Sequence, residues 1–150
     1  MIFLTVSVLA LSFPGCGKKE NTSDRTLRVG IVTYTQDDPF INTMTEQIRE
    51  DLKLKESKDM KILVSVKNGD NDQRDQDELV EEMIAAGCDV LCVNLVDRTA
   101  PSDIIKAARQ EKIPVIFFNR EPVKEDLMQW DQLYYVGCDA KQSGEMQGEI

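Results

Sequence analysis

The 150-residue sequence contains no histidine, and this absence removes a whole group of reaction mechanisms. Histidine is the commonest general base and metal ligand because its imidazole ring titrates near neutral pH. An enzyme built from this chain would have to rely on carboxylate, lysine or thiol chemistry instead.

The sequence also lacks a long run of basic residues. Its 27 acidic side chains outnumber 18 basic ones, giving a formal net charge of −9 and an isoelectric point near 4.6. A surface with this balance repels the phosphate backbone of nucleic acids. We therefore expect no nucleic acid among its partners.

Glycine-rich nucleotide fingerprints are missing as well. Gly30 stands alone inside a strand-like run, whereas a dinucleotide site needs a G-x-G-x-x-G motif directly after the strand. The acidic stretch at 70–72 has no later glycine and glutamate to complete a calcium loop, so it predicts a turn before a helix. A receiver-type phosphorylation site is disfavoured because Asn94 stands where the phosphorylated aspartate would be.

Cysteine is scarce, and its spacing matches no metal or redox motif. Beyond Cys16, the sequence has Cys88, Cys92 and Cys138, with no C-x-x-C pair. Buried free thiols are therefore expected, against the alternative of a metal or redox site. An odd number of thiols in this part of the chain also provides no disulfide framework.

The first fifteen residues form a separate unit. Met1–Phe13 is apolar or small throughout, but a membrane-spanning helix needs roughly 20 apolar residues. We expect residues 1–15 to be a signal peptide of the bacterial lipoprotein type, with Cys16 as the lipidated residue after cleavage. An uncleaved signal anchor and an ordinary buried segment are the alternatives. The polar composition after Cys16 predicts a flexible tether over residues 16–26.

From Leu27 onward, strand-like and helix-like patterns alternate. Apolar runs predict strands, and apolar residues at three- and four-residue steps predict helices. Five strands are expected, at 27–34, 61–66, 89–93, 113–118 and 133–136. Helices are expected from Pro39 to about Leu54, around Leu79–Ile84 with an end at Gly87, from Pro101 through Ala108, and from Lys141 onward.

Alternating strands and helices predict right-handed β-α-β crossovers and a parallel sheet with helices on both faces. Residues 27–150 are therefore expected to form an α/β domain of three layers (α/β/α), with a five-stranded parallel sheet in the order 2-1-3-4-5. That order places the switch point between the first and third strands, where ligands bind in folds of this kind.

Polar side chains follow three of the predicted strands directly. Asp37, Asp38 and Phe40 follow the first strand, Asn94 follows the third, and Asn119 and Arg120 follow the fourth. Parallel strands bring these ends to one edge of the sheet, so the side chains are expected to be neighbours. Carboxylate and amide groups suit sugar hydroxyls, and an aromatic ring suits the C–H face of a sugar. Taken alone, Asp38 is better explained as a helix cap, and Asn94 equally well as a loop tie.

Several segments resemble one bacterial family. They are YTQDDPF at 34–40, INTMTEQI at 41–48, NGDNDQRDQDE at 68–78, NLVD at 94–97, IPVIFFNREP at 113–122 and YYVGCDAKQSGEMQGE at 134–149. Together they are similar to the N-terminal lobe of the galactose/glucose-binding proteins of ABC importers, which are type I periplasmic binding proteins. Gln36 and Pro39 depart from the family pattern.

The resemblance implies a monosaccharide receptor that is not an enzyme and has no catalytic residue. By resemblance, Asp38 and Asn94 would hydrogen-bond sugar hydroxyls, and Phe40 would stack on the pyranose ring. The remaining strand-end side chains, which are Asp37, Asn119 and Arg120, would border the cleft.

The resemblance also implies what lies around this lobe. Family members close two lobes on the sugar, so the chain would be a fragment that lacks the second lobe and ends inside a helix at Ile150. No cofactor or metal ligand is expected in this segment, because the family's calcium site would lie in the missing lobe. The expected partners are glucose or galactose, the permease subunits of an ABC transporter and a chemoreceptor. The location would be extracytoplasmic, with Cys16 carrying the lipid that reaches the membrane.

Two other functions stay open at this point. A LacI-type sugar-responsive regulator shares the fold, but it would carry a basic helix-turn-helix before Leu27, where the sequence offers none. A carbohydrate-active enzyme would use Asp37 or Asp38 with Glu121 as paired carboxylates.

Overall fold

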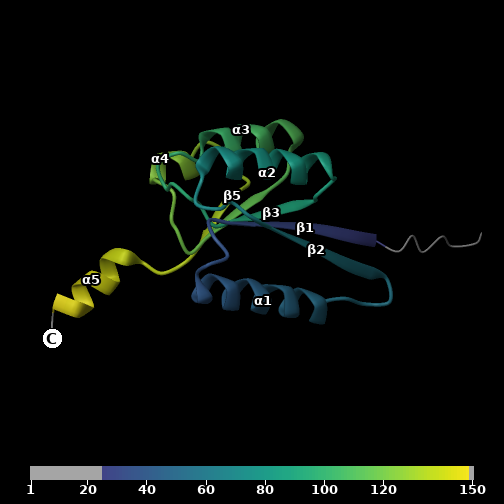
Figure 1. Ribbon diagram of the computed structural model, residues 1–150, viewed down its shortest axis with the longest axis horizontal. Coiled ribbons are helices and arrows are strands. Elements are labelled where there is room, and N and C mark those ends of the chain that lie inside the picture. The colour runs from purple at the N-terminus through teal and green to yellow at the C-terminus, as the bar shows by residue number, and fades with distance from the viewer. Residues whose placement is uncertain (1–24, 149–150) are drawn as a thin grey trace, which may run out of the picture.

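Five strands form one parallel sheet in the computed structural model, which describes residues 25–148 (Figure 1). The strands lie in the predicted order β2-β1-β3-β4-β5, and each neighbouring pair is parallel. Their bounds are β1 Arg25–Thr33, β2 Met60–Asn68, β3 Val90–Val93, β4 Val115–Phe118 and β5 Leu133–Val136. The chain moves outward from β1 to β2 and then returns to β3 on the other side, which places the switch point between β1 and β3.

Helices lie on both faces of the sheet and complete three layers (Figure 1). Their bounds are α1 Pro39–Leu54, α2 Gln73–Ala85, α3 Ser102–Glu111, α4 Lys124–Leu127 and α5 Ala140–Gly148. α1 covers one face, whereas α2, α3 and α4 lie on the other, and α5 extends away from the sheet (Figure 1). The predicted α/β fold of three layers is therefore confirmed.

The alternation of side chains along β1 produces a core on each face of the sheet. Val29 and Ile31 are buried on the α1 side, and Val32 is buried on the side of α2 and α3. The larger core lies on the α2 and α3 side and includes Leu91 and Phe117, both fully buried. Apolar residues of this kind on successive strands are what a sheet covered on both faces requires.

Gly30 allows α2 to approach the sheet closely. A Cβ atom at this position would lie 3.0 Å from the Cys88 sulfur, 3.1 Å from a Leu91 methyl carbon and 3.3 Å from the Met83 sulfur. The isolated glycine of the first strand is therefore explained by packing.

The α1 face is covered less completely toward β5. One row of paired residues crosses the sheet on this face, from Ile31 through Cys92 and Ile116 to Tyr134. Ile31 is fully buried beneath α1, Cys92 and Ile116 are half-buried, and Tyr134 is 50% exposed. The fourth strand is thus covered fully on one face and partly on the other, because α1 packs mainly over β1 and β2.

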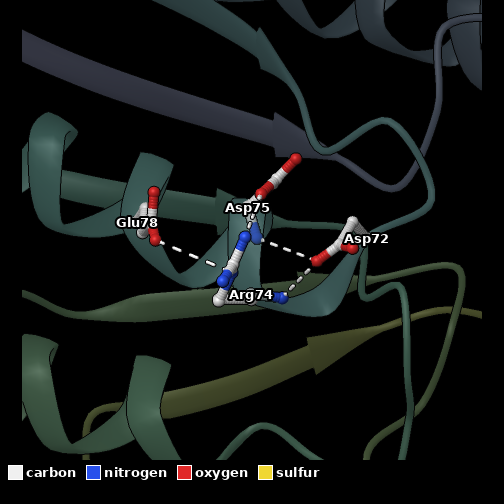
Figure 2. Close-up of polar contacts among 4 residues, drawn as sticks. All are labelled: Asp72, Arg74, Asp75 and Glu78. Atoms are coloured by element: carbon white, nitrogen blue, oxygen red, sulfur yellow. Dashed lines mark hydrogen bonds and ion pairs between the residues drawn. The ribbon is translucent and has the colours of Figure 1, made fainter.

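Aspartate side chains begin α1 and α2. Asp72 accepts hydrogen bonds from the main-chain nitrogens of Arg74 at 2.9 Å and Asp75 at 3.2 Å (Figure 2). Asp70 and Asn71 have φ angles of 50° and 61°, so the predicted turn before this helix is present. The Arg74 guanidinium lies 3.9 Å from Glu78, but both side chains are exposed and such a pair contributes little stability (Figure 2).

Several boundaries differ from the sequence expectations. β1 begins at Arg25, inside the stretch predicted as a tether, because the main chain of residues 25 and 26 pairs with the start of β2 at Met60 and Lys61. Backbone pairing of this kind needs no apolar side chain. The short α4 was not predicted.

The expected signal peptide at 1–15, Cys16, most of the tether and Ile150 lie outside the described residues. Across 25–148, no helix combines the length and the apolar character needed to cross a bilayer.

Candidate functional site

Three loops meet at the carboxyl edge of the sheet. They follow β1 at 34–38, β3 at 94–99 and β4 at 119–123, and we name them the β1 loop, the β3 loop and the β4 loop. Side-chain hydrogen bonds and one ring contact join each loop to another. The sequence-predicted site residues therefore lie in connected loops, apart from Phe40, which belongs to the first turn of α1.

Asp38 is a helix cap whose second oxygen has a different partner. Oδ1 accepts from the main-chain nitrogens of Phe40 at 2.8 Å and Ile41 at 3.4 Å, so the capping interpretation is confirmed. Oδ2 accepts from the Tyr34 hydroxyl at 2.7 Å. The Tyr34 hydrogen bond, followed by the Phe40 amide, holds the pKa of Asp38 below its ordinary value. Asp38 is therefore held as an ionised acceptor.

Phe40 presents an aromatic ring to the surface at the start of α1. Its side chain is 60% exposed, although a large apolar group usually gains by burial. Pro39 occupies the first helical position and directs the chain from Asp38 into the helix. Asp37, the other acid of this loop, is exposed, and its main-chain nitrogen donates to the Thr35 hydroxyl at 3.1 Å.

Asn94 is fully buried where β3 ends. Its Nδ2 donates to the main-chain oxygen of Phe118 at 3.0 Å and to Oδ1 of Asn119 at 3.4 Å. The loop-tie interpretation is thus confirmed, and the predicted proximity of Asn94 and Asn119 is observed. Oδ1 of Asn94 is also buried and has no hydrogen-bond partner among the described residues. An acceptor in this condition is costly unless something else supplies a donor.

Arg120 joins the β4 loop to both other loops. Its Nη1 donates to the main-chain oxygens of Leu95 at 3.1 Å and Val96 at 2.9 Å. Its guanidinium carbon also lies 3.6 Å from the centre of the Tyr34 ring, which is a cation–π contact. In the opposite direction, Arg98 of the β3 loop donates to the main-chain oxygen of Glu121. The β3 and β4 loops therefore hold each other through one arginine each.

The main chain of Asn119, the first residue of the β4 loop, has a left-handed conformation. Its φ angle is 63°, a conformation that asparagine tolerates better than most residues. Its main-chain nitrogen donates to Val136 at 3.0 Å, and its main-chain oxygen accepts from the Tyr135 hydroxyl at 3.2 Å. These bonds hold the loop against the end of β5.

Two glutamines of α2 support the β3 loop, and sequence reasoning did not identify them. Gln76 is fully buried, and its Nε2 donates to the Asn94 main-chain oxygen at 3.0 Å while its Oε1 accepts from Val96 N at 2.9 Å. Gln73 accepts from the Asp97 main-chain nitrogen at 2.8 Å. A signal for Gln76 was present, because it stands one turn before the buried Val80 on the apolar face of α2.

An open groove of about 510 Å³ borders the β4 loop. Its lining includes Asn119, Arg120 and Glu121 of that loop, Arg98 of the β3 loop, and side chains beyond β5. Within residues 25–148, no three acidic, cysteine or histidine side chains converge as a metal site would require. The groove is polar, with both charges represented, and suits a small hydroxylated molecule better than an apolar one.

A family profile for a periplasmic binding protein domain matches residues 29–150. The D-galactose/methyl-galactoside binding periplasmic protein MglB of Haemophilus influenzae is 35% identical over 123 residues, which cover 82% of this chain and 36% of that protein. The chain spans a little over a third of the length of the first curated relatives it matches.

Two solved structures are similar in fold and sequence. An ABC transporter solute-binding protein from Clostridium phytofermentans with bound β-D-glucose is 25% identical, with a TM-score of 0.68, and the match covers 81% of this chain and 35% of that chain. A carbohydrate transporter solute-binding protein from Chloroflexus aurantiacus in complex with D-glucose is 28% identical, with a TM-score of 0.65, over 83% of this chain and 34% of that chain. With the strand order, the helical layers and the family profile in agreement, the chain belongs to the periplasmic binding protein family.

Proposed function

We propose that this chain is the sugar-binding lobe of an extracytoplasmic receptor that captures galactose or glucose and delivers it to an ABC permease. The observation that carries the proposal is the pairing of an ionised acceptor, Asp38, with the exposed ring of Phe40 at the switch point of the sheet. A pyranose needs both groups, because its hydroxyls donate hydrogen bonds at its edge and its C–H bonds form an apolar face.

The unused hydrogen-bonding capacity of the site supports the same ligand class. A carboxylate has about four acceptor positions, and Asp38 uses its two oxygens on two amides and one hydroxyl. The unpartnered Oδ1 of Asn94 is a further acceptor at the same edge, although it is buried, and a sugar hydroxyl reaches it only if the surrounding loops move. Sugar hydroxyls are the donors we assign to both residues, with Asp37, Asn119 and Arg120 at the border of the cleft.

A relative's named ligand narrows the choice of sugar. The protein named for D-galactose and methyl-galactoside is 35% identical to this chain, and both solved structures described above hold glucose. Because this chain spans about a third of these proteins, we propose that a second lobe closes the cleft. Permease subunits, and a chemoreceptor in addition, would then recognise the closed form.

An enzymatic role is less well supported than binding. A paired-carboxylate mechanism needs one acid with a raised pKa to donate a proton. The pKa of Asp38 is lowered instead, mainly by the Tyr34 hydrogen bond. Members of the family are described as binding proteins, and we infer that this chain performs no chemistry on its ligand.

Calorimetric titration of the full-length protein, with the proposed second lobe present, against D-galactose, D-glucose and D-ribose tests the proposal. Galactose or glucose should bind, and Phe40→Ala should weaken binding about tenfold or more, because ring stacking and apolar burial are lost together. Leu54→Ala is the matched control, since Leu54 is 82% exposed at the other end of the same helix, about 21 Å along its axis. Absence of binding to all three sugars would refute the proposal, as would a Phe40→Ala protein that binds normally.

Asp38→Asn separates the ligand role of Asp38 from its capping role. Asparagine caps helices as well as aspartate does, so the start of α1 should stay intact. Loss of the charged acceptor should weaken sugar binding about 10- to 100-fold, since hydrogen bonds to charged groups contribute roughly 1.5–3 kcal/mol. A variant that lost helix content by circular dichroism would instead show that capping was the main role of Asp38.

The 150-residue chain alone should bind sugar weakly. A binding pocket normally buries about 70–90% of a small ligand, and one lobe leaves its outer side in water. Tight binding of galactose or glucose by this chain in the same titration would contradict the two-lobed clamp.

We also propose that residues 1–15 are a lipoprotein signal, that Cys16 carries the lipid, and that residues 16–24 form the tether. The apolar run is too short to span a bilayer and precedes a cysteine, as such signals require. Metabolic labelling with a radioactive fatty acid should mark the full-length protein and should fail with Cys16→Ser. Equal labelling of both proteins would exclude this anchor.

A further inference from the structure

A continuous series of contacts links Asp38 to the two loops on the other side of the switch point. The main-chain oxygens of Leu95 and Val96 accept from Arg120, Arg120 lies over the ring of Tyr34, and the Tyr34 hydroxyl donates to Asp38. The series therefore begins on the β3 loop, passes through the β4 loop and ends on the β1 loop. Each contact involves a side chain that is at least partly buried.

Arg120 and Tyr34 lie in the middle of this series. The guanidinium of Arg120, and the ring and hydroxyl of Tyr34, are all engaged in its contacts. Arg120 directs one nitrogen to two carbonyl oxygens and places its planar group 3.6 Å from the Tyr34 ring centre. Tyr34 has one hydroxyl proton, and the hydrogen bond of 2.7 Å to Asp38 uses it. A planar guanidinium is suited to this double role, whereas a lysine ammonium is a point charge that cannot stack in the same way.

We propose that Tyr34 and Arg120 are positioning residues for the Asp38 carboxylate, so that sugar affinity depends on Arg120 through Tyr34. The inference rests on the proposed function, in which Asp38 binds the ligand. The helix cap holds only Oδ1 of Asp38, through two amides, and Tyr34 holds Oδ2. Without Tyr34, the carboxylate would keep its cap but lose the bond that holds its second oxygen in one direction.

The charges around Asp38 lead to a measurable consequence. Its pKa is lowered first by the Tyr34 hydroxyl, then by the Phe40 and Ile41 amides, and to a smaller extent by the charge of Arg120, while partial burial opposes them. Conversely, Asp38 raises the pKa of Tyr34 and Arg120 lowers it. Removing the Tyr34 hydroxyl should therefore raise the pKa of Asp38 most, and removing the Arg120 charge should raise it less.

The first test needs no ligand. Carbon-13 NMR of the aspartate carboxyl groups in this chain, followed as the pH falls, should show a higher pKa for Asp38 in Tyr34→Phe and a smaller rise in Arg120→Gln. Asp97 is the internal control, because Thr99 of its own loop lowers its pKa through a main-chain and a side-chain hydrogen bond. An Asp38 titration that Tyr34→Phe leaves unchanged would overturn the inference, and so would an equal change at Asp97.

The second test uses sugar binding by the full-length protein. Tyr34→Phe and Arg120→Lys should each weaken binding about five- to tenfold, and the loss of binding at acidic pH should begin at a higher pH in Tyr34→Phe. Arg120→Lys keeps the positive charge and loses the stack, so its acid limb should stay near that of the wild type. A wild-type protein that binds no monosaccharide would refute the proposed function and leave the NMR test intact. Normal affinity and an unchanged acid limb in Tyr34→Phe would refute the positioning role while sugar binding stands.

Discussion

Gln76→Ala is expected to destabilise the chain by about 3–5 kcal/mol, although Gln76 lies on a helix and is not among the residues proposed to contact the sugar. The side chain is fully buried between α2 and the end of β3. Its amide nitrogen donates to the Asn94 main-chain oxygen, and its amide oxygen accepts from Val96 N. Alanine removes both bonds and leaves both main-chain groups in place.

The expected magnitude is the sum of three contributions. The main-chain oxygen of Asn94, a fully buried residue, would be left without a hydrogen-bond donor, which costs about 1–3 kcal/mol. Val96 is a partly exposed residue, so its main-chain nitrogen can recover a bond to water, and the loss of its bond to Gln76 contributes about 1 kcal/mol. The space left by the side chain adds about 1 kcal/mol more. The total is a large share of the roughly 5–15 kcal/mol by which a domain is stable.

Urea unfolding followed by circular dichroism and by Trp130 fluorescence measures this loss. Trp130 packs against the larger core and should report its opening. Gln76→Leu restores much of the volume but none of the hydrogen bonds, so it should still lose about 2–4 kcal/mol. Gln73→Ala is the matched control on the same helix, and its loss should be about 0.5–1 kcal/mol because Gln73 is only partly buried.

Two results would refute this reasoning. The first is a Gln76→Ala loss below about 1 kcal/mol, which would mean that the β3 loop finds other partners easily. The second is a loss equal to that of Gln73→Ala, which would mean that burial of the amide is unimportant. Equal losses in Gln76→Leu and Gln76→Ala would assign the whole effect to the hydrogen bonds.

Three further outcomes are expected. Phe40→Ala should leave the urea midpoint nearly unchanged while it weakens sugar binding, because its ring is already 60% exposed. Burial raises the pKa of Asp77 above its ordinary value of 3.8, so the ionised form opposes folding. Asp77→Asn should therefore be more stable than the wild type at pH 7, as thermal melts would show, and this advantage should disappear as the pH falls below 3.8. Burial also raises the pKa of Cys92 to about 11, so iodoacetamide at pH 8 should modify exposed Cys138 first, and Cys92 only after unfolding, as peptide mass mapping can show.

The sheet order was predictable because its determinants are local. Apolar runs and helical periodicity identify the main strands and helices, and right-handed crossovers leave few arrangements for them. α4 was missed because it has only four residues, Lys124–Leu127, and no side-chain cap. The start of β1 at Arg25 was missed because pairing with β2 involves the main chain and leaves no mark in side-chain pattern.

The candidate site was predicted in position more than in detail. Asp38, Asn94, Asn119 and Arg120 follow strands, and the parallel sheet brings their loops to one edge. The sequence did not indicate that Asn94 is fully buried with its nitrogen on Phe118, because that bond joins two strands far apart in the chain. The stack of Arg120 on Tyr34 was likewise not foreseen, since Tyr34 had been assigned to the strand.

By itself, the sequence determined the α/β class, the strand order, the strand ends that carry the polar groups and the family resemblance. These follow from periodicity and short motifs, which are properties of neighbouring residues. Only the tertiary structure decided how each polar atom is used. Asp38 divides its oxygens between a helix and Tyr34, and Gln76 supports a loop that it does not belong to. The physical reason is that hydrogen-bond partners are selected by distance and burial in the folded chain, and parallel strands make residues neighbours that the sequence keeps far apart.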